Sequence, residues 1–295
     1  MGKKTCPKQF LAYLGPAGTY CEEAALSYPG PQLLRQALGS IGEVFEAVRQ
    51  GVAEKGVVPL ENSITGTVNS TLDLLAGEEL LQIEAELIIP VQHNLLVPRK
   101  TDLSKITAVV SHPQALAQCQ QFLDNALPQV KCLSASSTAE AARMIACGEP
   151  LWFNSDSPGA AIASGRAAET YGLKIAAANI NDVPRNHTRF VVISQRDALP
   201  TGRDKTSLVF ALAHHPGSLL KALTTLAAAG INLTKIESRP SKRSLGEYWF
   251  FVDIEGHHQD FQVENALGQL FKQTVWHRLL GSYPVADEEK MCISE

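Results

Sequence analysis

The sequence predicts an α/β protein in two parts: a two-lobed module, followed by a small domain with the strand and helix order βαββαβ. Over the first two thirds of the chain, short apolar runs alternate with helix-start signals, which favours parallel sheets with crossover helices. An extended stretch at 87–97 has a matching return at 190–193, so two strands would carry the chain from one lobe to the other and back. After a polar linker at 198–205, the remaining elements follow the ferredoxin-like order.

The bulk composition indicates a globular chain and excludes several classes of protein. Its 295 residues suffice for about two domains. Hydrophobic residues make up 45% and charged residues 19%, which argues against disorder, and the net charge of −4 gives no basic surface for nucleic acid. The six cysteines lack metal-ligand spacing, so we expect no metal and reduced thiols in a cytoplasm. No apolar run is long enough for a signal peptide or a membrane span.

The first element is an apolar run at 10–14, ended by the turn Gly15-Pro16-Ala17-Gly18-Thr19. Thr19 and Glu22 have capping-box spacing, so a helix is expected to start there. A strand, a glycine turn and a helix start form an anion-binding arrangement, which makes Gly18 and Thr19 candidates for substrate binding. The alternative is a purely structural turn.

Further helix starts are expected at Ser40, Ser111, and Ser137 or Thr138, each two or three residues before an acidic or amide side chain. Helix starts gather at the carboxyl ends of parallel strands, so Ser111, Ser137 and Thr138 could line an anion-binding crevice, or serve as caps alone. Ala161 lies in the small-residue run 160–164, where backbone N–H groups could approach an anion. That run could equally be a tightly packed helix start.

The main candidate for a functional segment is Glu61-Asn62-Ser63, which follows an apolar strand ended by Pro59. Polar groups between a strand and a helix are where open α/β sheets bind ligands. The alternative is a polar turn with a helix cap.

The C-terminal part is expected to form four strands and two helices. The strands are expected at 206–213, 231–238, 246–254 and 275–280, and the helices at 219–227 and 261–271. Both faces of 248–254 are largely apolar, although the two helices can cover only one face. The other face must therefore meet a second domain or a second subunit, and we favour the subunit.

Glu61-Asn62-Ser63 resembles the Glu-Asn-Ser signature of prephenate dehydratases, and Thr188-Arg189-Phe190 resembles the Thr-Arg-Phe motif of that family. The turn at 15–19 resembles a third family motif. The stretches 216–220 and 237–240 resemble the phenylalanine-binding motifs of its ACT regulatory domain. Ser218 stands where Ala is expected, and no chorismate mutase or prephenate dehydrogenase segment is fused on, which implies a monofunctional enzyme.

The resemblance implies that the chain converts prephenate to phenylpyruvate, water and CO2, with feedback regulation by L-phenylalanine. It also implies a catalytic domain like a two-lobed periplasmic binding protein and a homodimer or homotetramer. We expect the catalytic domain at 7–197, with lobes at about 7–88 plus 188–197 and at 89–187. The ACT domain is expected at 206–283 and a tail at 284–295.

Aromatisation drives this reaction, so the protein needs to hold prephenate and help hydroxide leave, without a cofactor. The resemblance makes Thr188 the donor, Asn62 and Ser63 positioning groups and Glu61 an orienting group. Arg189 could bind a carboxylate, but adjacent strand residues face opposite ways, so either it or Thr188 supports structure unless the backbone is irregular. A salt bridge from Arg189, for example to Glu61, stays open.

For the effector, the resemblance places a carboxylate site on the loop that enters a helix and an ammonium site at Glu237. The candidates are Pro216, Gly217, Ser218, Leu219, Glu237, Ser238 and Arg239. A surface ion pair is the alternative for Glu237 and Arg239. Three other functions stay open: arogenate dehydratase, a non-catalytic two-lobed binding protein, and a transcriptional regulator, the last disfavoured by the missing helix-turn-helix segment.

Overall fold

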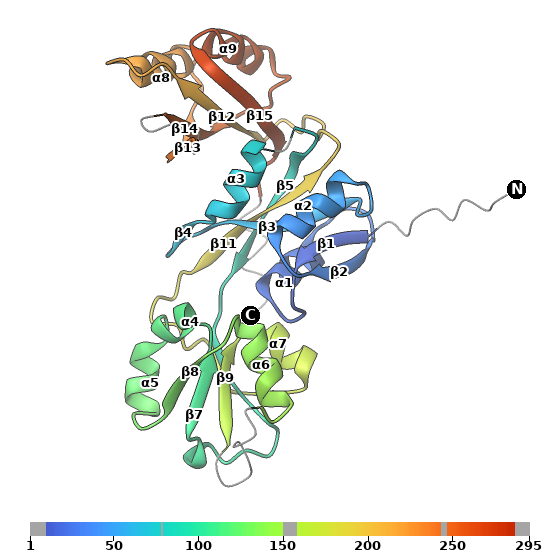
Figure 1. The fold of residues 1–295 in the computed structure, drawn as a ribbon, viewed down its shortest axis with the longest axis vertical. Coiled ribbons are helices and arrows are strands. Elements are labelled where there is room, and N and C mark those ends of the chain that lie inside the picture. Colours follow the sequence, from blue (N-terminus) through green and yellow to red (C-terminus); the bar gives the residue numbers. More distant parts are fainter. Residues whose placement is uncertain (1–9, 78, 150–157, 243–246, 287–295) are drawn as a thin grey trace, which may run out of the picture.

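The computed structural model describes residues 10–77, 79–149, 158–242 and 247–286. In this part of the chain the strands form three sheets, stacked along the long axis of the molecule (Figure 1). The C-terminal domain lies at the top of the view, the first lobe in the middle and the second lobe at the bottom. The fold class predicted from the sequence is confirmed.

The first lobe is built on a six-stranded sheet in the order β2-β1-β3-β11-β5, with β4 paired to β3. Helix α1 packs on one face of the sheet, and α2 and α3 pack on the other. Thr19 and Ser40 cap α1 and α2 as the sequence predicts, by accepting backbone N–H groups. The elements of this lobe are β1 (Phe10–Leu14), α1 (Tyr20–Ser27), β2 (Leu34–Leu38), α2 (Ile41–Arg49), β3 (Lys55–Asn62), β4 (Gly66–Thr67), α3 (Asn69–Gly77), β5 (Gln82–Pro90) and β11 (His187–Ser194).

The second lobe has a five-stranded sheet in the order β10-β6-β9-β7-β8. The run at 160–164 is not a helix start: 159–163 form the buried strand β9, and Ser164 caps the helix that follows. The elements are β6 (Asn94–Val97), a 3-10 turn (Leu103–Lys105), β7 (Ala108–Ser111), α4 (Pro113–Ala117), α5 (Gln120–Ala126), β8 (Lys131–Ser134), α6 (Thr138–Ala146), β9 (Gly159–Ala163), α7 (Gly165–Tyr171) and β10 (Lys174–Ala177).

Two connections join the lobes, as the extended stretches predict. Strand β5 continues through 91–93 into β6, and the chain returns from β10 into β11, which lies between β5 and β3 in the first lobe. Both connections lie at the same level of the molecule, between the two sheets (Figure 1).

The C-terminal domain has the predicted βαββαβ order, with neighbouring strands antiparallel in the order β13-β14-β12-β15. Helices α8 and α9 cover one face, where Leu208, Phe210, Val252 and Ile254 are buried. The elements are β12 (Asp204–Leu212), α8 (Ser218–Ala228), β13 (Leu233–Pro240), β14 (Tyr248–Glu255), α9 (Phe261–Phe271) and β15 (Thr274–Pro284).

The other face of this sheet packs against the first lobe of the same chain. Val209, Phe251 and Tyr283 share a buried cluster with Leu75, Leu81, Ile83 and Val191. The preference for a second subunit as the cover was therefore wrong, because the pattern showed two buried faces without showing what buries them. Backbone contact is close: a Cβ on Gly281 would lie 2.3 Å from the carbonyl oxygen of Ile83.

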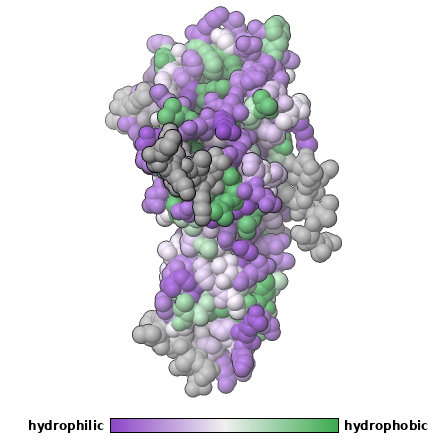
Figure 2. All heavy atoms as spheres, turned by 90° about the vertical axis from the view of Figure 1, so that its right-hand side faces the viewer, coloured by the Kyte–Doolittle hydropathy of each residue, from purple (hydrophilic) through white to green (hydrophobic). Residues whose placement is uncertain are grey.

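No helix in the described ranges is long and apolar enough to cross a membrane. On the side shown in Figure 2, hydrophobic residues form small groups separated by hydrophilic ones.

Candidate functional site

A pocket of about 280 Å³ opens between the two lobes, and we call it the cleft. Both lobes contribute to its walls, and so does the connection at 91–93. The lining residues are Tyr20, Asn62, Thr65, Val68, Val91, His93, His112, Gln114, Ala115, Gln118, Ser136, Ser137, Thr138 and Thr188. These lining residues include no Lys or Arg, so an anionic ligand would be held mainly by neutral donors.

Asn62 and Thr188 meet at the floor of the cleft, where the end of β3 pairs with the start of β11. The Asn62 Oδ1 accepts the backbone N–H groups of Ile64 and Thr65, both at 3.0 Å. This fixes the orientation of the side-chain amide, so its Nδ2 must donate on the other side. It donates to the Thr188 Oγ1 at 2.9 Å and to the Asn186 Oδ1 at 2.7 Å.

The Thr188 hydroxyl therefore accepts from Asn62 and keeps its own proton for another partner. The side chain is buried, and among the described residues no acceptor takes that proton. Because Thr188 lines the cleft, its O–H is available to a ligand in that space. The arrangement makes Thr188 a hydrogen-bond donor to whatever occupies the cleft.

The same chain of hydrogen bonds reaches the second lobe through Asn186. Its Nδ2 donates to the Gln118 Oε1 at 3.3 Å. That oxygen also lies 3.0 Å from the His93 Nε2, so this ring nitrogen carries the hydrogen. Burial lowers the pKa of His93, which keeps the ring neutral.

Gln118 is thereby turned so that its Nε2 is a buried donor with no partner in the described part of the chain. Because an unpaired buried donor is costly, this atom is suited to a ligand oxygen. Gln118 is not among the site residues predicted from the sequence. It lies one helical turn after Gln114, so helix periodicity from the predicted start at Ser111 could have found it.

The start of α6 forms the opposite wall of the cleft. Ser137 caps the helix by accepting the backbone N–H of Glu140 at 3.0 Å, and Ser136, Ser137 and Thr138 line the pocket. The positive end of the helix dipole thus faces the cleft, as expected for an anion site.

The other predicted substrate groups do not line the cleft. The Ser63 Oγ accepts the backbone N–H of His187 at 3.0 Å, which ties β3 to β11. The Ser111 hydroxyl donates to the Ile162 carbonyl at 2.6 Å, and Ala161 is buried within β9. Gly18 and Thr19 belong to a turn that contacts the second lobe, where Ser164 donates to the Gly18 carbonyl at 3.1 Å.

Glu61 and Arg189 face away from the cleft, toward the C-terminal domain. Arg189 pairs with Glu86 at 2.8 Å and with Asp253 at 2.6 Å, and lies 4.0 Å from Glu61. Glu61 pairs with Lys235 at 2.7 Å. The cleft thus gathers Asn62, Ser137, Thr138 and Thr188 from the predicted set.

The effector candidates divide between the two faces of the C-terminal sheet. Ser218 and Leu219 line a pocket of about 120 Å³ together with His214, Tyr248 and Phe250, and Gly217 precedes the helix with a φ of 84°. Pro216 lies next to that glycine, outside the pocket lining. Ser238 pairs with Phe250 and so shares the face of this pocket. Glu237 and Arg239 lie on the opposite face, against the first lobe.

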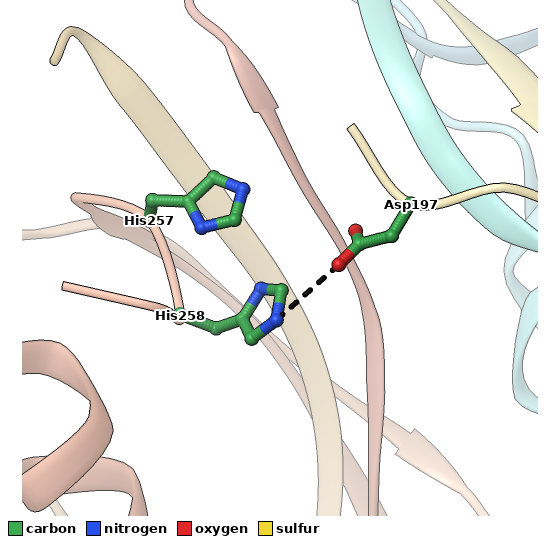
Figure 3. Close-up of side chains that lie close together, drawn as sticks. All are labelled: Asp197, His257 and His258. Atoms are coloured by element: carbon green, nitrogen blue, oxygen red, sulfur yellow. Dashed lines mark ion pairs between the residues drawn. The ribbon is translucent and has the colours of Figure 1, made fainter. Parts of the chain in front are cut away.

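A second cluster of titratable groups joins the segment after β11 to the loop after β14. His258 Nε2 lies 3.3 Å from an Asp197 carboxylate oxygen, and the His257 ring stacks on His258 (Figure 3). The His257 Nδ1 accepts from the backbone of Gln259, and its Nε2 donates to the carbonyl of Ala198. Since both ring nitrogens of His257 are already bonded, we treat the cluster as a contact between domains and not as a metal site.

Two family profiles match the chain. The profile described as prephenate dehydratase matches residues 11–198, and that of the ACT domain matches residues 206–272.

Individual proteins are also similar. The bifunctional chorismate mutase/prephenate dehydratase of Aquifex aeolicus is 44% identical over 94% of this chain and 74% of its own. The prephenate dehydratase of Amycolatopsis methanolica is 40% identical over 94% of this chain and 89% of its own. A solved prephenate dehydratase from Arthrobacter aurescens, in complex with L-Phe, superposes with a TM-score of 0.85 at 37% identity, covering 95% of this chain and 91% of its own.

Proposed function

This chain belongs to the prephenate dehydratase family, and we propose that Thr188, Asn62 and Gln118 are the groups with which it holds and activates its substrate. The reaction converts prephenate to phenylpyruvate, water and CO2. The observation that carries the proposed site is the free hydroxyl proton of Thr188, directed into the cleft by the fixed amide of Asn62.

The chemistry asks for one well-placed donor. The bond to the ring carboxylate breaks and its electron pair enters the ring, while the bond to the ring hydroxyl breaks at the opposite carbon. The hydroxyl leaves with its electron pair and takes up a proton from solvent to become water. In the proposed site Thr188 donates its hydrogen bond to this oxygen as negative charge develops there, an interaction that strengthens in the transition state.

Thr188 acts here as a donor and not as a nucleophile. A hydroxyl nucleophile needs a neighbouring base to take its proton. The side-chain partner of the Thr188 hydroxyl is the Asn62 Nδ2, which is itself a donor. No acceptor for that proton lies within the described residues.

The two substrate carboxylates would be held by neutral donors. The free Nε2 of Gln118 and the start of α6 at Ser137 and Thr138 supply them without a cation. Burial within the cleft strengthens such contacts, because few waters compete.

For the assignments that reach beyond the family, we propose a cytoplasmic homo-oligomer that binds L-phenylalanine at its C-terminal domain. The match to the ACT profile and the pocket beside Ser218 support this site, and the Arthrobacter relative was solved with the same amino acid. We retain the domain limits expected from the sequence: 7–197 for the catalytic domain, 198–205 for the linker and 206–283 for the ACT domain.

The test is product formation by the purified protein, given prephenate and arogenate in parallel, each with and without L-phenylalanine. We expect phenylpyruvate from prephenate, with a rate that L-phenylalanine reduces. Faster formation of phenylalanine from arogenate would make arogenate the substrate, and no product from either would contradict the enzyme assignment. Light scattering in the same buffers measures the oligomeric state.

A further inference from the structure

The two residues at the floor of the cleft each have a neighbour that points the other way. Thr188 pairs with Asn62 in the register of β11 and β3, and Arg189 pairs with Glu61. Partners in register share a face of the sheet, and adjacent residues take opposite faces. Asn62 and Thr188 therefore face the cleft, whereas Glu61 and Arg189 face the C-terminal domain.

An irregularity in the pairing makes this possible. The register passes from Arg189–Glu61 to Phe190–Pro59, so Leu60 is an extra residue on β3. Such a bulge re-aims the side chains beyond it. It brings Glu61 onto the face of Arg189 and leaves Asn62 beside Thr188.

Arg189 is held almost entirely by partners on the far side of the sheet. Its Nε bonds Glu86 at 2.8 Å, its Nη1 bonds Asp253 at 2.6 Å, and its Nη2 donates to the Tyr283 hydroxyl at 2.7 Å. Asp253 and Tyr283 belong to β14 and β15 of the C-terminal domain, and the Arg189 side chain is only 13% exposed. The residue that follows the donor in sequence is thus anchored in the other domain.

Glu61 is held by β13 of the same domain. The Lys235 Nζ bonds its carboxylate at 2.7 Å and lies 3.7 Å from Glu237, which accepts from the Thr67 hydroxyl at 2.5 Å. Farther along β13, Arg239 pairs with Asp73 at 3.1 Å. Glu237 and Arg239 are two of the seven predicted effector residues. Strand β13, which carries them, is therefore bonded to the segment 61–73, which includes Asn62.

We propose that Lys235 and Asp253 of the C-terminal domain are positioning residues of the catalytic centre, acting through Glu61 and Arg189 on Asn62 and Thr188. The proposal rests on the proposed function and deepens it, because it assigns the route by which the effector domain controls the rate. A ligand that shifts β13 moves Lys235 away from Glu61, and the misplaced donor lowers kcat while the second-lobe wall still binds substrate. By linkage, substrate in the cleft alters effector affinity by the same factor.

The variant Lys235→Met tests this, because it keeps the length of the side chain and removes the charge. We expect kcat to fall about tenfold with KM within twofold of wild type, and the inhibition by L-phenylalanine to weaken. Lys235→Arg should restore most of kcat. The matched control is Lys242→Met, since Lys242 also bonds the first lobe, at Asp73, but is 69% exposed and lies away from Glu61; it should behave as wild type.

A double-mutant cycle separates positioning from general stability. If Lys235 acts through Glu61, Glu61→Gln and the double variant Glu61→Gln/Lys235→Met should lose kcat to the same extent as Lys235→Met. Multiplying losses would overturn the route, as would a folded Lys235→Met protein with wild-type kcat and inhibition. Should Lys235→Met not fold, Lys235→Gln and the single variant Glu61→Gln carry the same comparison, with folding followed by thermal denaturation.

Failure of the proposed function would look different. Wild-type protein that turned over neither prephenate nor arogenate would refute the assigned reaction. If the wild type is active and the variants at Lys235 and Glu61 have the same kcat as wild type, only the coupling is refuted.

Discussion

Strands β3 and β11 border two regions that differ in kind, although the same two strands contribute to both. On one side lies the cleft, an open space of about 280 Å³ lined by neutral donors, one of which has no partner among the described residues. On the other side lies the contact with the C-terminal domain, filled by apolar side chains and by an ion network around Arg189. The difference shows how one sheet can keep polar groups available for a ligand on one face, while packing and ion pairs on the other face hold its strands in position.

Removing the charge of Arg189, at the contact with the C-terminal domain, should have the largest effect on stability. Arg189→Met would leave Glu86 and Asp253 buried with fewer cationic partners, although Lys205 still bonds Glu86 at 2.9 Å. Loss of one partner from a buried ion pair costs about 3–5 kcal/mol, so we expect a loss near the low end. Urea unfolding measures it, with Arg166→Met as the control, because that cation is 35% exposed. Equal stability of the two variants would mean that the network contributes little.

On the cleft side, Thr188→Val should affect rate and not stability. Valine keeps the shape of the side chain and removes the donor, so we expect kcat to fall about 10²-fold or more, with KM little changed. Thr188→Ser keeps the hydroxyl and should stay within about tenfold of wild type. Steady-state kinetics at saturating prephenate decide the point; a folded Val variant with full kcat would remove Thr188 from the donor role.

Gln118→Leu should show the next smaller effect, mainly on binding. It removes the free donor of the cleft and the acceptor for Asn186 and His93. One hydrogen bond to a charged group is worth about 1.5–3 kcal/mol, so we expect KM to rise about tenfold or more. Gln120→Leu is the control, because this exposed glutamine lies outside the cleft lining and its amide bonds Asp124 at 2.7 Å. An unchanged KM for Gln118→Leu would mean that substrate does not use this donor.

The smallest effect should be the contribution of His93 to the pH dependence of stability. Burial lowers the pKa of His93 in the folded protein, so the unfolded chain takes up its proton first as the pH falls below about 6.5. His93 then contributes a loss of stability between that pH and its lower folded pKa. Glu23 acts in the opposite sense, because burial raises its pKa to about 6.

Comparing wild type with His93→Asn cancels the contribution of Glu23. The fall in melting temperature between pH 7.5 and pH 5.5 should be smaller in the variant. An identical fall in both proteins would show that His93 titrates as in the unfolded chain.

The sequence carried the fold well where the signal was local. Alternating strands and helix starts, the βαββαβ order and the caps at Thr19, Ser40 and Ser137 all depend on neighbours in the chain, and the structure contains them. Separated motifs also singled out Asn62 and Thr188, which lie together in the lining of the cleft.

What the sequence could not supply was the partner of each buried face and the direction of certain side chains. Alternation from Val57 onward would put Glu61 opposite to the face it takes, and only the pairing with β11 reveals the extra residue Leu60. The free donor of Gln118 likewise depends on Asn186, 68 residues away along the chain. Such features arise from long-range pairing, which leaves little trace in a local pattern.

The bare backbone at Gly281 has a mechanical consequence. It lets β15 lie directly on Ile83, near the start of β5. Seven residues farther on, that strand ends at Pro90, and the next residue, Val91, lines the cleft. At about 3.3 Å per residue, this span makes a rigid arm of about 23 Å. If β5 tilted by about 5° at Ile83, its end next to the cleft would move by about 2 Å, which exceeds the range of distances that a hydrogen bond allows. A side chain at position 281 would push β15 and β5 apart at Ile83.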